Sequence, residues 1–428
     1  MSRKIYKAII AVAATAISVS FASKSNAQFL LNNDSAYKAN TPNTGRLWGY
    51  AFGDYYFKGH ADSLSRGGSN QYTGIPKDRN AFQMRRIYLG YDYNISKKFS
   101  TELLLAAEDN FPAGDPPTST SPSGDETLNG KLTFYIKLAN LRWKNIWKGT
   151  DLVVGQQATP AFPGITEKVW AYRSIERTIA DIRRTPSYDL GVSLQGVFDP
   201  ETKNYGYNVM MGDGSSAKPE SDNFKWYYAD VWAKFMNQKL VFDLYADYER
   251  LNLNPGAHGS RQMIKGFAAY NTPALTVGVE GFINTMANGE VATKIGGGTE
   301  TLTQHATGLS VYVHGNIIKD KLRFFARYDN YKPLSVDNNK YSAYKLNVGN
   351  YNDNSYTMVA GVPTATGDAT YKQDFVSAGL DFTPIKNVHF MPNIWYNHYA
   401  SQMPGVTGAT AGDYDLVYRM TFYFTFGK

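Results

Sequence analysis

The C-terminal stretch YDLVYRMTFYFTFGK, from Tyr414 to Lys428, alternates between two kinds of side chain with a period of two. One face is apolar and aromatic throughout: Leu416, Tyr418, Met420, Phe422, Phe424 and Phe426. The other face is mixed and carries the polar groups: Asp415, Val417, Arg419, Thr421, Tyr423 and Thr425. Alternation with this period predicts a β-strand that has one apolar face and one largely polar face.

Four other segments repeat the pattern, at 99–108, 240–249, 275–284 and 322–329. Asp, Glu and Arg side chains stand in the middle of these segments, on the second face. The dry core of a soluble sandwich could not hold that many unpaired charges. The segments therefore predict strands that have lipid on one side and water on the other, as in a transmembrane β-barrel.

The whole chain divides into about sixteen such strands, with fourteen and eighteen as alternatives. We expect them near 46–57, 80–93, 99–109, 130–144, 150–157, 188–198, 205–212, 223–235, 240–250, 260–270, 274–285, 308–317, 322–331, 371–382, 388–400 and 414–427. Short turns alternate with long polar links, such as 58–79, 110–129, 158–187, 286–307 and 332–370. Short turns at one rim and long loops at the other are typical of outer-membrane barrels. The predicted fold is all-β: a single closed antiparallel transmembrane β-barrel.

Length and composition exclude several other classes. The 428 residues include no cysteine, which rules out a disulfide scaffold, a thiolate metal site and a Cys nucleophile. A membrane-spanning helix needs about 20 consecutive apolar residues. The run nearest to that length is 8–22, so the chain is not a helical membrane protein. Aromatic residues such as Trp48, Tyr50 and Phe52 are candidates for the belts at the membrane interface.

The N-terminus has the pattern of a secretory signal peptide, with a short membrane anchor as the alternative. Basic residues precede the apolar run, and Ser25-Asn26-Ala27 offers an export cleavage site. The predicted parts are a signal peptide at 1–27, a periplasmic extension at 28–45 and the barrel at 46–428. Loss of four basic residues with the signal lowers the net charge from +7 to +3. We therefore expect no nucleic-acid partner.

At the level of motifs, the chain resembles the phosphate-selective porin O and P family. The similar region runs through Val154-Gly155-Gln156-Gln157, Thr159-Pro160-Ala161-Phe162-Pro163, Glu176-Arg177 and Asp189-Leu190-Gly191-Val192-Ser193-Leu194-Gln195-Gly196. The resemblance implies a sixteen-stranded homotrimer with an arginine-lined pore. The terminal strand also resembles the signal that the barrel-assembly machinery reads, carried here by Tyr418, Met420, Phe422, Phe424 and Phe426.

The link 158–187 is predicted to fold into the lumen as a constriction. Ile175, Ile179 and Ile182 share one face at helical spacing and would pack on the barrel wall. The predicted constriction residues are Arg173, Arg177, Arg183, Arg184 and Glu176. A ring of one charge in a pore concentrates the opposite ion. The alternative is an extracellular loop or a trimer latch with a solvated charged face.

The predicted pore wall carries inward-facing arginines: Arg86, Arg323, Arg327 and Arg419. Inward-facing carboxylates alternate with them, and the open alternative is that the two kinds of charge simply pair. No motif of a hydrolase, a metalloprotease or a nucleotide-binding loop is present. Asn350-Tyr351-Asn352-Asp353-Asn354 could hold Ca²⁺, but asparagine-rich loops are common, so no metal or cofactor is expected.

These observations predict a porin of the outer membrane, through which small hydrophilic solutes or inorganic anions diffuse passively. The expected partners are outer-membrane lipid, the assembly machinery and two further copies of the chain. Two alternatives stay open at this point. One is a structural or adhesive barrel without transport, and the other, which is less favoured, is an outer-membrane enzyme.

Overall fold

The computed structural model describes residues 41–64, 66, 71–108, 127–128, 131–183, 186–220, 223–254, 257–346, 356–359, 362–365, 371–403 and 412–427. The predicted signal peptide at 1–27, most of the predicted extension at 28–45, Arg184 and the asparagine-rich segment 350–354 lie outside the described residues. Among the residues described, no helix is long and apolar enough to cross a membrane.

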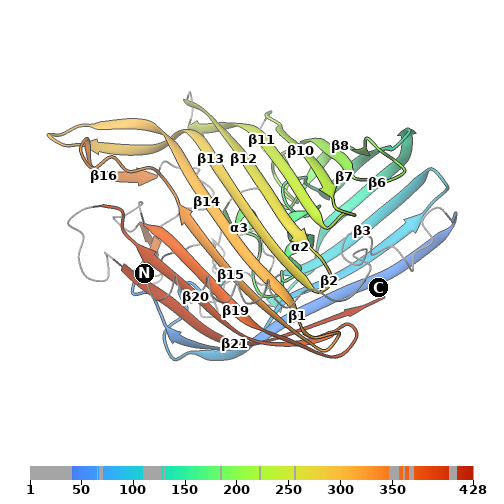
Figure 1. The fold of residues 1–428 in the computed structure, drawn as a ribbon. Helices are drawn as coiled ribbons and strands as arrows, with labels where there is room; N and C mark the ends of the chain where they lie inside the picture. The colour runs from blue at the N-terminus through green and yellow to red at the C-terminus, as the bar shows by residue number, and fades with distance from the viewer. Residues whose placement is uncertain are drawn as a thin grey trace.

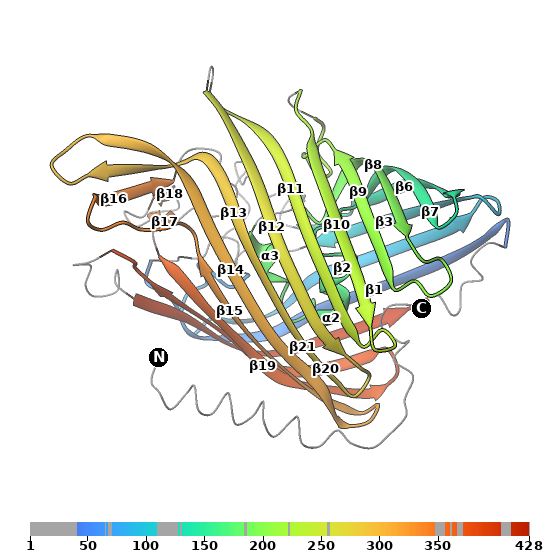
Figure 2. The same cartoon turned by 45° about the horizontal axis from the view of Figure 1, so that its top comes forward.

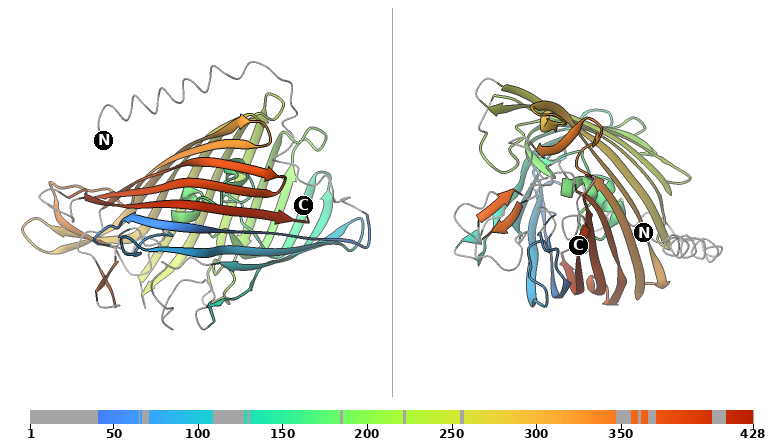
Figure 3. Two further views of the ribbon diagram at one scale, coloured as in Figure 1. Left: turned by 90° about the horizontal axis from the view of Figure 1, so that it is seen from below. Right: turned by 90° about the vertical axis from the view of Figure 1, so that its left-hand side faces the viewer.

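Sixteen antiparallel strands form one closed barrel, each paired with the next along the chain (Figures 1 and 3). The first eight are β1 (Thr44–His60), β2 (Asn80–Asn94), β3 (Phe99–Glu108), β6 (Tyr135–Trp147), β7 (Thr150–Ala158), β8 (Tyr188–Val197), β9 (Tyr205–Gly212) and β10 (Trp226–Phe235). The second eight are β11 (Leu240–Asn254), β12 (Ala257–Asn271), β13 (Leu275–Lys294), β14 (Thr299–Ile318), β15 (Leu322–Lys332), β19 (Lys372–Ile385), β20 (Val388–Ala400) and β21 (Gly412–Phe426). Pairing of β1 with β21, from Gly49–Phe426 to His60–Leu416, closes the ring. The predicted sixteen-stranded barrel is confirmed.

The long-loop rim carries additional sheet that the sequence did not predict. The expected link at 286–307 is wrong, because β13 and β14 continue through it as a hairpin that projects beyond the barrel (Figure 2). The strand β16 (Tyr341–Leu346) pairs with the projecting part of β13. Two short hairpins, β4 (Thr127–Leu128) with β5 (Lys131–Leu132) and β17 (Tyr356–Val359) with β18 (Val362–Ala365), complete the rim.

The two faces of the wall have opposite chemistry. Along β21, Tyr418, Met420, Phe424 and Phe426 are 39–47% exposed on the outside, whereas Arg419 is buried on the inside. Large exposed apolar side chains cover the outside of the other strands in the same way, and an exposed apolar band of this extent is unstable in water. The interior holds the charged groups, so the predicted assignment of lipid and lumen faces along 414–426 is confirmed.

A β-bulge between Phe52 and Gly53 changes which side chains of β2 reach the lumen. An extra residue on one strand shifts the alternation and lets two consecutive side chains share a face. Arg85 and Arg86 both point inward here: Arg85 pairs with Asp54 at 3.1 Å and Arg86 pairs with Glu108. The inward face of β1 also includes Trp48, Tyr50 and Phe52, three residues that sequence analysis had placed in the interface belts. Tyr50 packs against Tyr88, Phe52 packs against Tyr423, and Trp48 stacks on Tyr50.

The outward face of the terminal strand provides a test of assembly. Replacing Phe426 by aspartate places a charge on the apolar face beside the β1–β21 closure, so the amount of barrel in the outer membrane should fall severalfold. The measurement is the heat-modifiable folded band in outer-membrane fractions. The matched control is Thr425→Asp, whose side chain faces the lumen and which should insert normally. Equal levels of the two variants would contradict the lipid-facing assignment.

Candidate functional site: the constriction of the lumen

The link between β7 and β8 leaves the long-loop rim and folds into the barrel, as predicted (Figure 1). It forms two short helices, α2 (Thr166–Trp170) and α3 (Ile179–Arg183), instead of one continuous helical face. Ala171 ends α2 in the left-handed conformation, with φ at 61°. The turn that follows, at 172–177, reverses the chain inside the lumen. We call residues 159–183 the inner loop.

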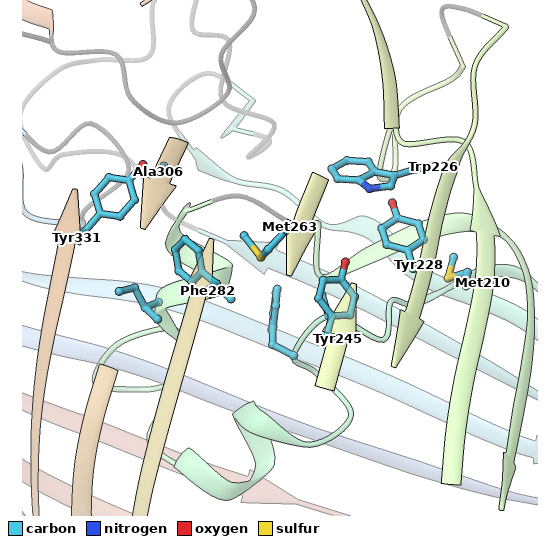
Figure 4. Packing of buried hydrophobic residues seen from close by; sticks show 12 residues of the cluster. Met210, Trp226, Tyr228, Tyr245, Met263, Phe282, Ala306 and Tyr331 are labelled. Atoms are coloured by element: carbon cyan, nitrogen blue, oxygen red, sulfur yellow. The ribbon is translucent and has the colours of Figure 1, made fainter. Parts of the chain in front are cut away.

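The apolar side of the inner loop packs on the wall, as the isoleucine pattern predicted. Ile175, Ile179 and Ile182 are all buried. The cluster around Ile179 contains wall residues from β9 to β15, shown in Figure 4: Met210, Trp226, Tyr228, Tyr245, Met263, Phe282, Ala306 and Tyr331. A second cluster joins Val169, Trp170 and Ile175 to the neighbouring part of the wall. Burial of these side chains holds the inner loop against one half of the barrel.

Guanidinium groups of the wall hold the turn of the inner loop by its backbone. Arg85 donates a hydrogen bond of 2.8 Å to the carbonyl oxygen of Ser174. Arg419 donates one of 3.1 Å to the carbonyl oxygen of Ile175, and Arg327 donates one of 2.6 Å to that of Arg177. A buried carbonyl oxygen needs such a partner, and a charged donor makes the bond stronger. Arginines from three strands, β2, β15 and β21, thus hold consecutive parts of one turn.

Two further wall groups hold helix α2. Lys265 donates a hydrogen bond of 2.9 Å to the Thr166 hydroxyl and pairs with Asp243 at 2.8 Å. The Nε2 of His314 donates one of 3.0 Å to the carbonyl oxygen of Val169. The cations of this half of the wall therefore act on the inner loop and are not simply exposed to the channel.

The four predicted wall arginines thus have different surroundings. Arg327 and Arg419 hold the turn, and Arg327 also pairs with Asp329 at 2.5 Å. Arg323 bonds the hydroxyl of Tyr172 at 3.3 Å and the side chain of Asn316 at 2.9 Å. Arg86 lies on the other half of the wall. The structure does not bring these four arginines together into one selectivity ladder.

The predicted constriction residues also separate into two groups. Arg183 faces the wall, where it donates to the side chain of Gln373 and lies 4.3 Å from the ring centre of Tyr331. Glu176 is buried, and its carboxylate accepts a hydrogen bond of 2.8 Å from the indole of Trp395. Both residues anchor the inner loop. Only Arg173 and Arg177 of the described set belong to its lumen side.

On that lumen side the arginines are paired within the loop. Arg173 forms ion pairs with Glu167 and with Asp181, the latter at 2.7 Å, and Arg177 lies 3.8 Å from Asp181. Burial by itself raises the pKa of Asp181, but Arg173 and Arg177, with smaller effects of Arg86 and Lys137, bring it below its ordinary value. The Asp181 carboxylate therefore stays ionised, and its pairs stay formed, at every pH above that lowered pKa.

The opposite half of the wall contributes a second charged group. Glu108 pairs with both Arg86 and Lys137, and it accepts a hydrogen bond from the hydroxyl of Tyr88. Arg86 and Lys137 lie close enough to Asp181, and Arg173 to Glu108, for the two groups to interact electrostatically. Lys168, in the middle of α2, is exposed and adds a cation on the loop side. We call these eight residues the constriction: Arg86, Glu108, Lys137, Glu167, Lys168, Arg173, Arg177 and Asp181.

Two of the groups that matter here, Arg85 and Lys137, do not follow from a strict alternation of faces along the sequence. Arg85 points into the lumen because of the bulge at Phe52–Gly53. Lys137 does so because of a second register shift where β6 pairs with β3. The visible signal for the second shift was the loss of alternation along 130–144. Within the described residues, no group of three or more His, Asp or Glu side chains could hold a metal ion.

Removal of one anchor should loosen the turn. In Arg419→Ala the carbonyl oxygen of Ile175 loses its donor, which costs about 1–3 kcal/mol for a buried polar group. The inner loop should then leave its position more often, and the noise of the open-channel current should rise. Single-channel recording measures this. The control is Arg142→Ala, because Arg142 also lines the lumen but, within the described part of the chain, donates its hydrogen bonds to the wall residues Asp151 and Gln195. Equal noise in the two variants would contradict the anchoring.

No protein-family model and no curated protein sequence matches this chain. Solved structures match it in shape. The outer-membrane channel DcaP of Acinetobacter baumannii matches with a TM-score of 0.55 at 10% identity, covering 90% of this chain and 98% of that one. The anion-selective porin from Comamonas acidovorans gives 0.53 at 10% identity, covering 90% and 100%, and OmpF of Salmonella typhi with daunomycin gives 0.52 at 10%, covering 90% and 98%. The chain has the barrel fold of outer-membrane porins.

Proposed function

We propose that this chain is a diffusion channel of the outer membrane for small hydrophilic solutes. The observation that carries the proposal is the inner loop, which is folded into a closed barrel and held there by Arg85, Arg327 and Arg419. A barrel that served only as an anchor or an adhesin would not need a loop fixed at mid-lumen. A narrowed, charged passage selects solutes by size and charge.

The polarity of the barrel supports this function. Its outside is apolar and suits lipid, while its inside carries ion pairs that suit water. The similar solved structures include an outer-membrane channel and an anion-selective porin. The proposal involves no catalytic step and no cofactor. A homotrimer and a phosphate preference, both implied by the motif resemblance, stay predictions.

The charge of the constriction favours a modest preference for anions. Five of its residues are basic (Arg86, Lys137, Lys168, Arg173 and Arg177) and three are acidic (Glu108, Glu167 and Asp181), so five minus three leaves +2. Most of these charges are paired, which weakens the field that a passing ion meets. Lys168 is exposed, and we expect it to contribute most to the preference.

Selectivity can be measured as the reversal potential in a KCl gradient across a planar bilayer. The native channel should prefer chloride. The double variant Lys168→Glu with Arg177→Glu leaves three basic and five acidic groups, so the net charge of the constriction becomes −2 and the preference should reverse. Inorganic anions that enter the native channel should then be excluded.

The matched control is Lys340→Glu, an equal charge change at an exposed position on the long-loop rim, outside the constriction. It should leave the reversal potential near the native value. A native channel that prefers cations would refute the anion preference and leave channel activity intact. Purified barrel that gives no conductance would refute the proposed function itself.

A further inference from the structure

Aromatic rings line the half of the lumen that faces the inner loop. They come from β1, β2, β6, β8 and β21, and we call them the aromatic track: Trp48, Tyr50, Tyr88, Tyr135, Tyr188 and Tyr423. Tyr88 is buried in the wall, and the other five are partly exposed. Tyr423 packs against the cluster that contains Val169, Trp170 and Ile175, so the track borders the inner loop.

The upper part of the track is continuous. The rings of Tyr135 and Tyr188 have centres 6.2 Å apart, and their hydroxyls are hydrogen-bonded at 3.2 Å. The ammonium group of Lys137 lies 4.8 Å from the ring centre of Tyr188 and 5.2 Å from that of Tyr88. Tyr135 and Tyr188 begin β6 and β8, at the rim with the long loops.

The lower part continues toward the rim with the short turns. Tyr50 lies 4.5 Å from Tyr88 and 6.1 Å from Tyr423, measured between ring centres. Trp48 lies 6.4 Å from Tyr50, and the two rings are within 12° of parallel. Gly90 makes room for the indole, since a Cβ there would come within 2.3 Å of Trp48. The track therefore passes the constriction from one rim side to the other.

Charged groups accompany the rings at three levels. Arg46 pairs with Asp92 at 2.6 Å on the strand pair that carries Trp48. Glu108 with Arg86 and Lys137 surrounds the hydroxyl of Tyr88. The pair of Glu167 with Arg173 lies on the inner loop, which borders the track at Tyr423. Each group sets hydrogen-bond donors and acceptors along the track.

We propose that the aromatic track is a path for pyranose sugars, an inference that rests on the proposed channel function and specifies its solute. A pyranose ring has an apolar C–H face that packs on an aromatic ring. Its rim of hydroxyls both donates and accepts hydrogen bonds, so it can bond both the cations and the carboxylates along the track. Binding sites commonly combine aromatic surfaces with a few fixed polar groups in this way.

Other small solutes fit the same surface less well. An inorganic anion has no apolar face and would leave the rings unused. An apolar aromatic compound would cover the rings but remove water from the ion pairs without replacing its hydrogen bonds, which is unfavourable. Successive rings spaced along the wall suit a solute that moves from one weak site to the next.

The test uses the full-length mature channel in a planar bilayer in KCl, with maltotriose as the probe. The KCl current should fall in a saturable way as maltotriose is added. In Tyr50→Ala the concentration for half-block should rise about tenfold, because a central ring contact is lost. Tyr50→Phe keeps the ring and should stay within about twofold of the native channel. Tyr248→Ala, which removes a ring from the outer surface, should not change the block.

Sorbitol distinguishes binding at the aromatic track from the general effect of a dissolved polyol on the current, since it has the hydroxyls of a sugar but no ring face. Equal, unsaturable reduction of the current by sorbitol and maltotriose would overturn the sugar path while leaving the channel intact. A Tyr50→Ala channel with the same half-block concentration of maltotriose as the native channel would overturn the sugar path as well. Absence of current before any sugar is added would overturn the channel proposal and the sugar path together.

Discussion

The hydrogen bonds from wall guanidiniums to the carbonyl oxygens of the inner loop are the interactions on which the interior of this barrel depends. A chain segment inside a wet lumen has buried backbone groups that no strand can satisfy. Arg85, Arg327 and Arg419 satisfy three carbonyls in one turn, at 174, 175 and 177. Without them the apolar packing of Ile175 and Ile179 would leave unpaired polar atoms beneath the loop.

This use of arginine divides the lumen into two halves. On the side from β9 to β15, the charges are largely occupied by the inner loop and by their own carboxylate partners, as in the pairs Lys265–Asp243 and Arg327–Asp329. A buried ion pair contributes little net stability, but removal of one partner is costly. The opposite half, from β21 through β1 to β8, also supplies Arg85 and Arg419 to the turn, but it keeps its rings and the pairs of Glu108 toward the passage. Selection of solutes therefore belongs to that half together with the lumen side of the loop.

The strands and the inner loop could be predicted from sequence because lipid and water impose a strict alternation on each strand. The terminal strand at 414–427 is the clearest case. The basic residues that face the lumen could not all be identified from sequence, because a bulge shifts the alternation by one residue and reverses every face beyond it. Arg85 and Lys137 were missed for that reason. The β13–β14 extension looked like a loop, since its Thr, Asn and Gly residues are polar on both faces. The aromatic character of Trp48 and Tyr50 could not show whether these rings lie in the lumen or at the membrane interface, because both environments accept them.

The central claim is that the inner loop occupies the lumen and sets its narrowest point. The most direct measurement is the single-channel conductance of a variant in which residues 165–183 are replaced by a short Gly-Ser linker. Only inserted channels are recorded, so a loss of folding yield does not affect the result. The account predicts that the conductance at least about doubles, because the passage widens. Conductance equal to that of the native channel would contradict it.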